Sequence, residues 1–108
     1  MATDTLSLKS RRLGDDIRLE IRIRHPMETG HRSDAQGQLI PAKYIQSLIV
    51  SDVTNGGDEV LFHAHCGTGI SRNPYFALEL LGVEKGAVLS VQWLDNFDDS
   101  DSRRIRVS

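Results

Sequence analysis

The segment IRLEIRIR, residues 17–24, carries the strongest pattern in the chain. Its aliphatic residues alternate strictly with charged ones, which is the period of a β-strand with one buried face. We therefore predict a strand that turns its isoleucines and leucine toward a core and its arginines and glutamate toward solvent. No helical period of useful length occurs elsewhere, so we expect an all-β chain.

Segments of the same period follow this strand. We predict further strands at residues 44–50, 59–66, 75–81, 87–94 and 103–107, with turns at 55–58 and 82–86. Six or seven short strands with regular turns are typical of a sandwich or a barrel. The predicted core comprises the inward residues of two strands: Ile17, Leu19, Ile21, Ile23, Leu89, Val91 and Trp93. Residues 1–13 lack a clear pattern, so we expect a flexible N-terminal arm before one domain at 14–108.

A long polar segment separates the first two of these strands. It reads HPMETGHRSDAQGQLIPAKYIQSL over residues 25–48, and most of it has no apolar period. Connections of this length are uncommon in compact domains and tend to be functional or disordered. Functional side chains also concentrate on loops that a rigid scaffold holds.

Composition narrows the class of protein. The 108 residues carry 13 basic and 15 acidic side chains, a net charge of −2, which disfavours nucleic acid as a partner. No apolar run approaches the roughly 20 residues that span a bilayer, so we expect no membrane span. The N-terminus has no apolar stretch of the kind that marks a secretory signal. A single cysteine rules out an internal disulfide.

The strand predicted at 59–66 offers candidates for thiol and metal chemistry. Cys66 shares a face with Val60, Phe62 and Ala64, which is the predicted core side, so we favour a buried, inert thiol. A nucleophilic thiol would need a nearby positive charge or a base. His63 and His65 share the opposite face and are more simply an outward polar pair than a metal site.

A metal site on the two histidines would need further ligands from the distant polar segment, where His25, Met27 and His31 are the candidates. No nucleophile-elbow or phosphate-loop motif occurs in the chain. The row of Arg18, Arg22 and Arg24 is most simply a solvated strand face, with anion binding as the alternative.

Three motifs together resemble a known family. These are the run HPMETGHR at residues 25–32 followed by IPA and YIQ, then RNPY at 72–75 and WLDN at 93–96. In this order they resemble SoxZ, one half of the sulfur-carrier complex of bacterial thiosulfate oxidation. The resemblance covers about residues 15–97. It implies an immunoglobulin-like antiparallel β-sandwich of about six or seven strands.

The resemblance also implies a function and a partner. SoxZ-type chains are non-catalytic, need no cofactor or metal, and form a heterodimer with SoxY, whose C-terminal cysteine carries the sulfur intermediates. Sox enzymes dock transiently on this pair, and the isolated chain is a possible homo-oligomer. The resemblance implies a periplasmic location by co-export with SoxY. The alternative from the residues is a small redox or metal-binding sandwich that uses Cys66 with His63 and His65.

The resemblance places partner recognition on two segments. The residues that match the family motifs there are expected to bind the partner: His25, Met27, Glu28, Arg32, Arg72, Asn73 and Tyr75. The alternative is that Glu28, Thr29 and Arg32 only hydrogen-bond the loop to itself.

Overall fold

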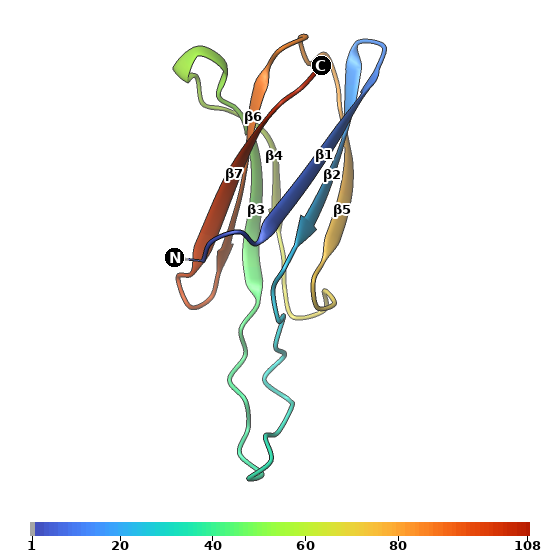
Figure 1. Cartoon of the computed structure of the whole chain (residues 1–108). Coiled ribbons are helices and arrows are strands. Elements are labelled where there is room, and N and C mark those ends of the chain that lie inside the picture. Colours follow the sequence, from blue (N-terminus) through green and yellow to red (C-terminus); the bar gives the residue numbers. More distant parts are fainter. Residues whose placement is uncertain (1) are drawn as a thin grey trace.

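A computed structural model of the chain describes residues 2–108, and the strands predominate in it (Figure 1). The chain forms seven strands and one short 3-10 helix, η1, which lies between the third and fourth strands. Their bounds are β1 Leu6–Leu13, β2 Asp16–Ile23, β3 Ile45–Asp52, η1 Thr54–Gly56, β4 Glu59–His65, β5 Tyr75–Leu80, β6 Val88–Asp95 and β7 Ser100–Arg106.

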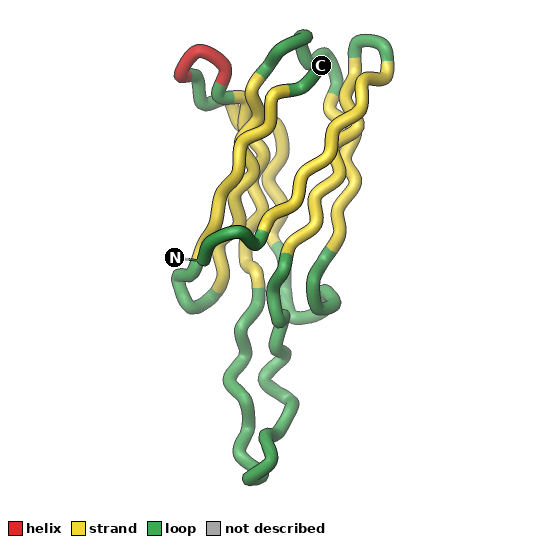
Figure 2. The backbone as a smooth tube through the Cα atoms, in the orientation of Figure 1, coloured by secondary structure: helices red, strands yellow, loops and turns green. Residues whose placement is uncertain are grey.

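The strands form two separate antiparallel sheets, as the tube in Figure 2 shows. One sheet has the order β1-β2-β5 and the other has the order β4-β3-β6-β7. The chain crosses between the sheets after β2, β4 and β5. The prediction of an all-β, immunoglobulin-like sandwich is therefore confirmed, and the barrel that the strand pattern also allowed is not formed.

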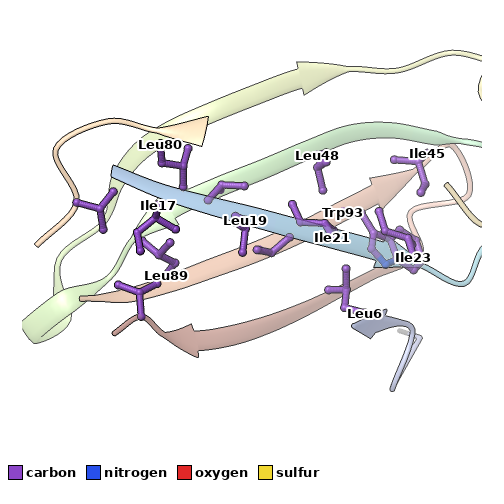
Figure 3. Close-up of a cluster of buried hydrophobic side chains, with 14 of the residues drawn as sticks. Leu6, Ile17, Leu19, Ile21, Ile23, Ile45, Leu48, Leu80, Leu89 and Trp93 are labelled. Carbon is purple, nitrogen blue, oxygen red and sulfur yellow. The ribbon is translucent and has the colours of Figure 1, made fainter. Parts of the chain in front are cut away.

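The core lies between the sheets and is built by strict alternation along the inner strands (Figure 3). All seven predicted core residues are at most 2% exposed, so that prediction is confirmed. The burial of such aliphatic and aromatic side chains is the main source of stability in a sandwich, at roughly 1.5–3 kcal/mol for each large side chain.

The predicted flexible arm at residues 1–13 is wrong for Leu6–Leu13, which form β1. This strand pairs with β2 along its whole length, from Leu6 opposite Ile23 to Leu13 opposite Asp16. The alternation is weak in the sequence because Ser10 and Arg12 occupy inward positions. Arg12 lies near the end of the sandwich, where its guanidinium donates to the carbonyl oxygen of Val83.

β4 departs from the predicted pattern at one residue. Phe62, Ala64 and Cys66 pack against the core as expected. Val60, predicted to lie on the same face, is 57% exposed. A β-bulge causes this, since Val50 pairs with Phe62 but the next residue, Ser51, pairs with Val60. One extra residue in a strand reverses the direction of the side chains that follow it.

Residues 25–44 form a long finger, which projects from one end of the sandwich (Figure 1). Its two arms run antiparallel, bridged at Glu28 with Lys43 and at Ser33 with Leu39. The tip is a tight turn in which Oδ1 of Asp34 accepts the N–H groups of Gln36 and Gln38. The finger gives the molecule its elongated form, 53 × 24 × 21 Å.

Candidate partner-binding site at the base of the finger

A buried carboxylate joins the finger to the sandwich. Asp95, the last residue of β6, is fully buried. Its Oδ2 accepts a hydrogen bond from Nε2 of His25 at 3.0 Å and lies 2.9 Å from Nζ of Lys43. Its Oδ1 accepts the N–H groups of Phe97 and Asp99, both at 2.9 Å. One side chain therefore holds both arms of the finger and the β6–β7 turn.

His25 is buried beside this carboxylate and has a defined tautomer. Its Nδ1 accepts the N–H of Met27 at 3.1 Å, so the ring hydrogen lies on Nε2, which donates to Asp95. The ring packs edge-on against Trp93, with 5.1 Å between centroids. Met27 is only 5% exposed, and its Sδ accepts the N–H of Ile45. Both residues serve the interior of the finger base.

Two asparagines secure the remaining backbone of the base. Oδ1 of Asn73 accepts the N–H of His25, and the N–H of Asn73 donates to the carbonyl of His25. Asn96 does the same for the other arm, since its Oδ1 accepts the N–H of Tyr44 and its Nδ2 donates to the carbonyl of Ala42. Buried or half-buried backbone groups need such partners.

The solvent side of the finger base carries a set of charged groups. Arg32 donates to both carboxylate oxygens of Glu28, from Nε at 3.2 Å and from Nη2 at 2.5 Å. The hydrogen bond from Arg32 holds the pKa of Glu28 below its ordinary value, and the positive charge of Arg72 contributes in the same direction. Arg72 belongs to the segment before β5, where the N–H of the next residue, Asn73, donates to the carbonyl of His25 at the start of the finger.

Tyr75 extends this surface onto the three-stranded sheet. Its hydroxyl donates to Oε1 of Glu20, and the guanidinium of Arg22 lies over its ring at 4.6 Å from the centroid. The ring is 43% exposed. A partly exposed aromatic ring next to an arginine is a common component of protein interfaces.

The structure separates the predicted partner-binding residues into two groups. The side chains of His25 and Met27 are buried and support the finger, so any part they play in partner binding, which stays a prediction, passes through the finger that they hold. Asn73 mainly hydrogen-bonds the backbone of His25. Partner contact by the others remains a prediction. Arg32, Arg72 and Tyr75 are exposed, whereas the side chain of Glu28 is only 12% exposed.

The residues at the centre of the base could not be identified from the sequence. Asp95 and Asn96 belong to the WLDN motif, which by itself indicates no structural role for them. No sequence pattern marks Lys43, because a single lysine in a polar segment looks like any lysine that is exposed to solvent. The contacts of these residues depend on strand ends that lie about 50 to 70 residues apart in the chain.

Cys66 and the two histidines of β4 lie on different faces of their strand. The rings of His63 and His65 are exposed and lie 4.5 Å apart. Cys66 is half-buried against the core, and burial raises the pKa of its thiol. Within residues 2–108, no three His, Cys, Asp or Glu side chains gather in a way that could hold a metal ion.

We expect Cys66 to react slowly with a chromogenic disulfide reagent at neutral pH. The reason is that burial disfavours the reactive thiolate. Absorbance should show a rate about tenfold or more below that of the same chain unfolded in urea, which serves as the control. Labelling of the native chain at the unfolded rate would contradict the buried position.

We also expect stability to fall in acid. Burial raises the pKa of Asp95, but its four hydrogen-bond donors outweigh this and hold the pKa below the ordinary 3.8. The pKa of Asp101 is also raised by burial, and the hydrogen bonds donated mainly by Thr5 outweigh this and lower it. Because these pKa values are lower in the folded chain, their contribution is complete above about pH 5 and is lost as the pH falls through about 4 and below. Urea titrations at several pH values would measure this.

The control for the acid experiment is Asp58→Asn, which alters an exposed carboxyl in the turn before β4. It should lose stability over the same pH interval as the natural chain. An unfolding free energy that stays level down to about pH 3 would contradict the role given to Asp95 and Asp101.

Fold and site together define the class: an immunoglobulin-like β-sandwich with one finger that is anchored by a buried carboxylate. The family model described as "Sulphur oxidation protein SoxZ" matches residues 6–106. The chain therefore belongs to the SoxZ family, and its role lies in sulfur oxidation. The match begins at β1, which agrees with the place of that strand in the domain.

Other comparisons bear on the fold alone. A crystal structure of superoxide reductase in the oxidized state superposes with a TM-score of 0.64, covering 96% of this chain and 87% of that one. The two sequences are 8% identical, so the likeness is one of architecture. Comparison with curated proteins gives no significant match. Among residues 2–108 there is no helix with the length and apolar character to cross a membrane.

Proposed function

We propose that this chain is the non-catalytic subunit of a two-chain sulfur carrier in thiosulfate oxidation. It binds a SoxY-type subunit, whose C-terminal cysteine carries the sulfur intermediates. The observation that carries the proposal is the SoxZ match over nearly the whole chain. The chemistry of the chain supports it, since its own cysteine is half-buried with a raised pKa and is poorly suited to carry sulfur.

The finger supports a binding role. Its base is held by buried and part-buried hydrogen bonds, and residues 31–39 are exposed. A loop that is already ordered loses less conformational entropy when it docks than a mobile one. Its exposed side chains are therefore available to a partner, or to the Sox enzymes that act on the pair.

Co-expression with the SoxY-type subunit of the same organism tests the proposal. An affinity tag on the SoxY-type subunit should capture this chain in a 1:1 ratio, as judged by native mass spectrometry. A carrier cysteine replaced by serine in the partner is the control and should leave assembly unchanged. If the two chains elute separately at micromolar concentration, the proposed function is wrong.

Recognition by the charged residues at the finger base and by Tyr75 gives a separate prediction. We expect Glu28→Ala with Arg32→Ala, and Arg72→Ala with Tyr75→Ala, each to weaken partner binding about tenfold or more. Calorimetric titration measures affinity, and thermal unfolding measures stability. A lower thermal midpoint with unchanged affinity of the folded fraction would show that these residues only hold the loop, as the bonds of Arg32 to Glu28 also permit.

The location follows from the partnership. We propose that the chain reaches the periplasm by co-export with its signal-bearing partner. Cell fractionation should find it in the periplasm when the partner is present and in the cytoplasm when the partner lacks its signal. Periplasmic chain without the partner would contradict co-export.

A further inference from the structure

Strand β5 forms an open edge of the three-stranded sheet. That sheet has the order β1-β2-β5, so β5 pairs with β2 on one side, and no strand of residues 2–108 pairs with its other side (Figure 1). An edge strand presents unpaired main-chain N–H and C=O groups that a strand of another chain can use. Natural proteins protect such edges with charged side chains, bulges or a covering segment.

The other three edges of the sandwich carry this protection, whereas β5 does not. The edge strands β1 and β7, with the sequences LSLKSRRL and SDSRRIR, hold three basic residues each. The edge strand β4 contains the bulge described above. β5 reads YFALEL, with Glu79 as its single charge and an unbroken register against β2.

The main-chain groups at this open edge belong to three residues. The N–H of Ile23 donates to the carbonyl of Pro74, so this opposite pair is hydrogen-bonded. Opposite pairs alternate along an antiparallel ladder between hydrogen-bonded and non-hydrogen-bonded ones. The N–H and C=O groups of Tyr75, Ala77 and Glu79 therefore point away from β2, toward the open edge.

The side chains of β5 fit an apolar neighbour at this edge. Phe76 and Leu78 point inward but are only partly buried, whereas the inward residues of β2 are at most 2% exposed. On the outer face, Ala77 is exposed and Tyr75 is 43% exposed. A further strand would cover the exposed parts of Phe76 and Leu78, which is favourable because apolar surface leaves water.

We infer that β5 pairs with β5 of a second copy of this chain, antiparallel and with Ala77 opposite Ala77 at a twofold axis. This register places Tyr75 opposite Glu79 of the second copy, so the three residues whose main-chain groups face the edge meet one another in hydrogen-bonded pairs. The two three-stranded sheets then form one continuous sheet. The pairing needs no partner of another kind, so the inference is independent of the proposed function.

The edge is complementary to itself in this register, as a twofold interface requires. On the inner side, Phe76 meets Leu78 of the second copy. On the outer side, Glu79 lies beside Tyr75 of the second copy, whose ring is covered by the guanidinium of Arg22. The carboxylate therefore approaches a positive charge, and no like charges lie opposite each other.

Sedimentation velocity of the full chain measures the pairing. Six residues of edge form a small interface, so we expect dimers with a dissociation constant on the order of 10–100 µM. Ala77→Pro should raise this constant about tenfold or more, because proline has no N–H to donate at the edge. Ala77→Lys should do the same, since the two lysines would lie opposite each other at the axis. Circular dichroism should show that both variants remain folded.

The matched control for the lysine is Ser102→Lys, an exposed position on the edge strand β7. It should change the dissociation constant by less than about twofold. A cross-link checks the register, because Cα atoms about 5.5 Å apart at the axis allow a disulfide. Oxidised glutathione should convert Ala77→Cys to a covalent dimer and leave Ser102→Cys monomeric.

Three results would overturn the inference. The first is a natural chain that stays monomeric at about 1 mM. The second is an equal effect of Ser102→Lys and Ala77→Lys, or a cross-link that forms in Ser102→Cys and not in Ala77→Cys. The third is a monomeric chain in which Ala77→Lys weakens capture by the SoxY-type subunit. That result would assign the edge to the other subunit and leave the proposed function standing.

Discussion

Replacing Asp95 by asparagine is expected to lower the unfolding free energy by about 3 kcal/mol or more. The carboxylate accepts the Nε2–H of His25 at the buried finger base, and it also offsets the charge of Lys43. An amide that turns its oxygen toward these two donors directs its NH₂ group at the N–H groups of Phe97 and Asp99. Either orientation leaves buried donors facing donors, which costs the desolvation of each unpaired group. Urea unfolding followed by tryptophan fluorescence measures the effect.

The matched control for this substitution is Asp98→Asn, three residues further along the same turn. Asp98 is exposed and has a φ of 58°, a backbone conformation that asparagine adopts readily. Its substitution should change stability by less than about 0.5 kcal/mol. Equal losses in the two variants would show that the turn, and not the buried network, carries the energy.

Replacing Trp93 by alanine is expected to cost about 4 kcal/mol. The indole is 1% exposed, packs edge-on with His25 and donates from Nε1 to Oγ1 of Thr5 at 2.8 Å. Thr5 in turn donates to Asp101 of β7, so the hydrogen bond from the indole ties β6 to the residue that precedes β1. The substitution leaves a cavity and releases this link. Thermal unfolding by circular dichroism measures the loss.

Two further variants separate packing from the hydrogen bond. Trp93→Phe retains most of the ring and should cost about half as much as alanine. Leu94→Ala, on the exposed side of the same strand, should cost less than about 1 kcal/mol. A loss in Leu94→Ala as large as in Trp93→Ala would contradict the assignment of the inward face.

Much of the fold could be read from periodicity. Ile17 to Ile23 and Leu89 to Trp93 alternate because one face of each strand meets the core, and this relation is local in the sequence. β1 could not be read in this way, because Arg12 fills an inward position near the end of the sandwich and bonds a carbonyl there. The bulge at Val50 was invisible for a similar reason, since it depends on how two strands pair.

The site was predicted only in part. The motifs predict partner recognition at residues 25–32 and 72–75, which stays a prediction. The structure brings the two segments together, since Oδ1 of Asn73 accepts the N–H of His25. Which residues point inward could not be predicted, because an extended loop with left-handed residues such as Met27, at φ 49°, has no regular period. Lys43 forms an ion pair with Asp95, which lies more than 50 residues further along the chain. No sequence pattern near Lys43 indicates this partner.

The finger is in mechanical terms a lever whose pivot is the buried carboxylate. Its arms share few bridges, so their direction is set where they leave the sandwich and little along their length. For an arm of roughly 30 Å, a rotation of about 5° at the base moves the tip by roughly 2–3 Å. Small changes around Asp95 would therefore be amplified at residues 34–37, far from the side chains that change.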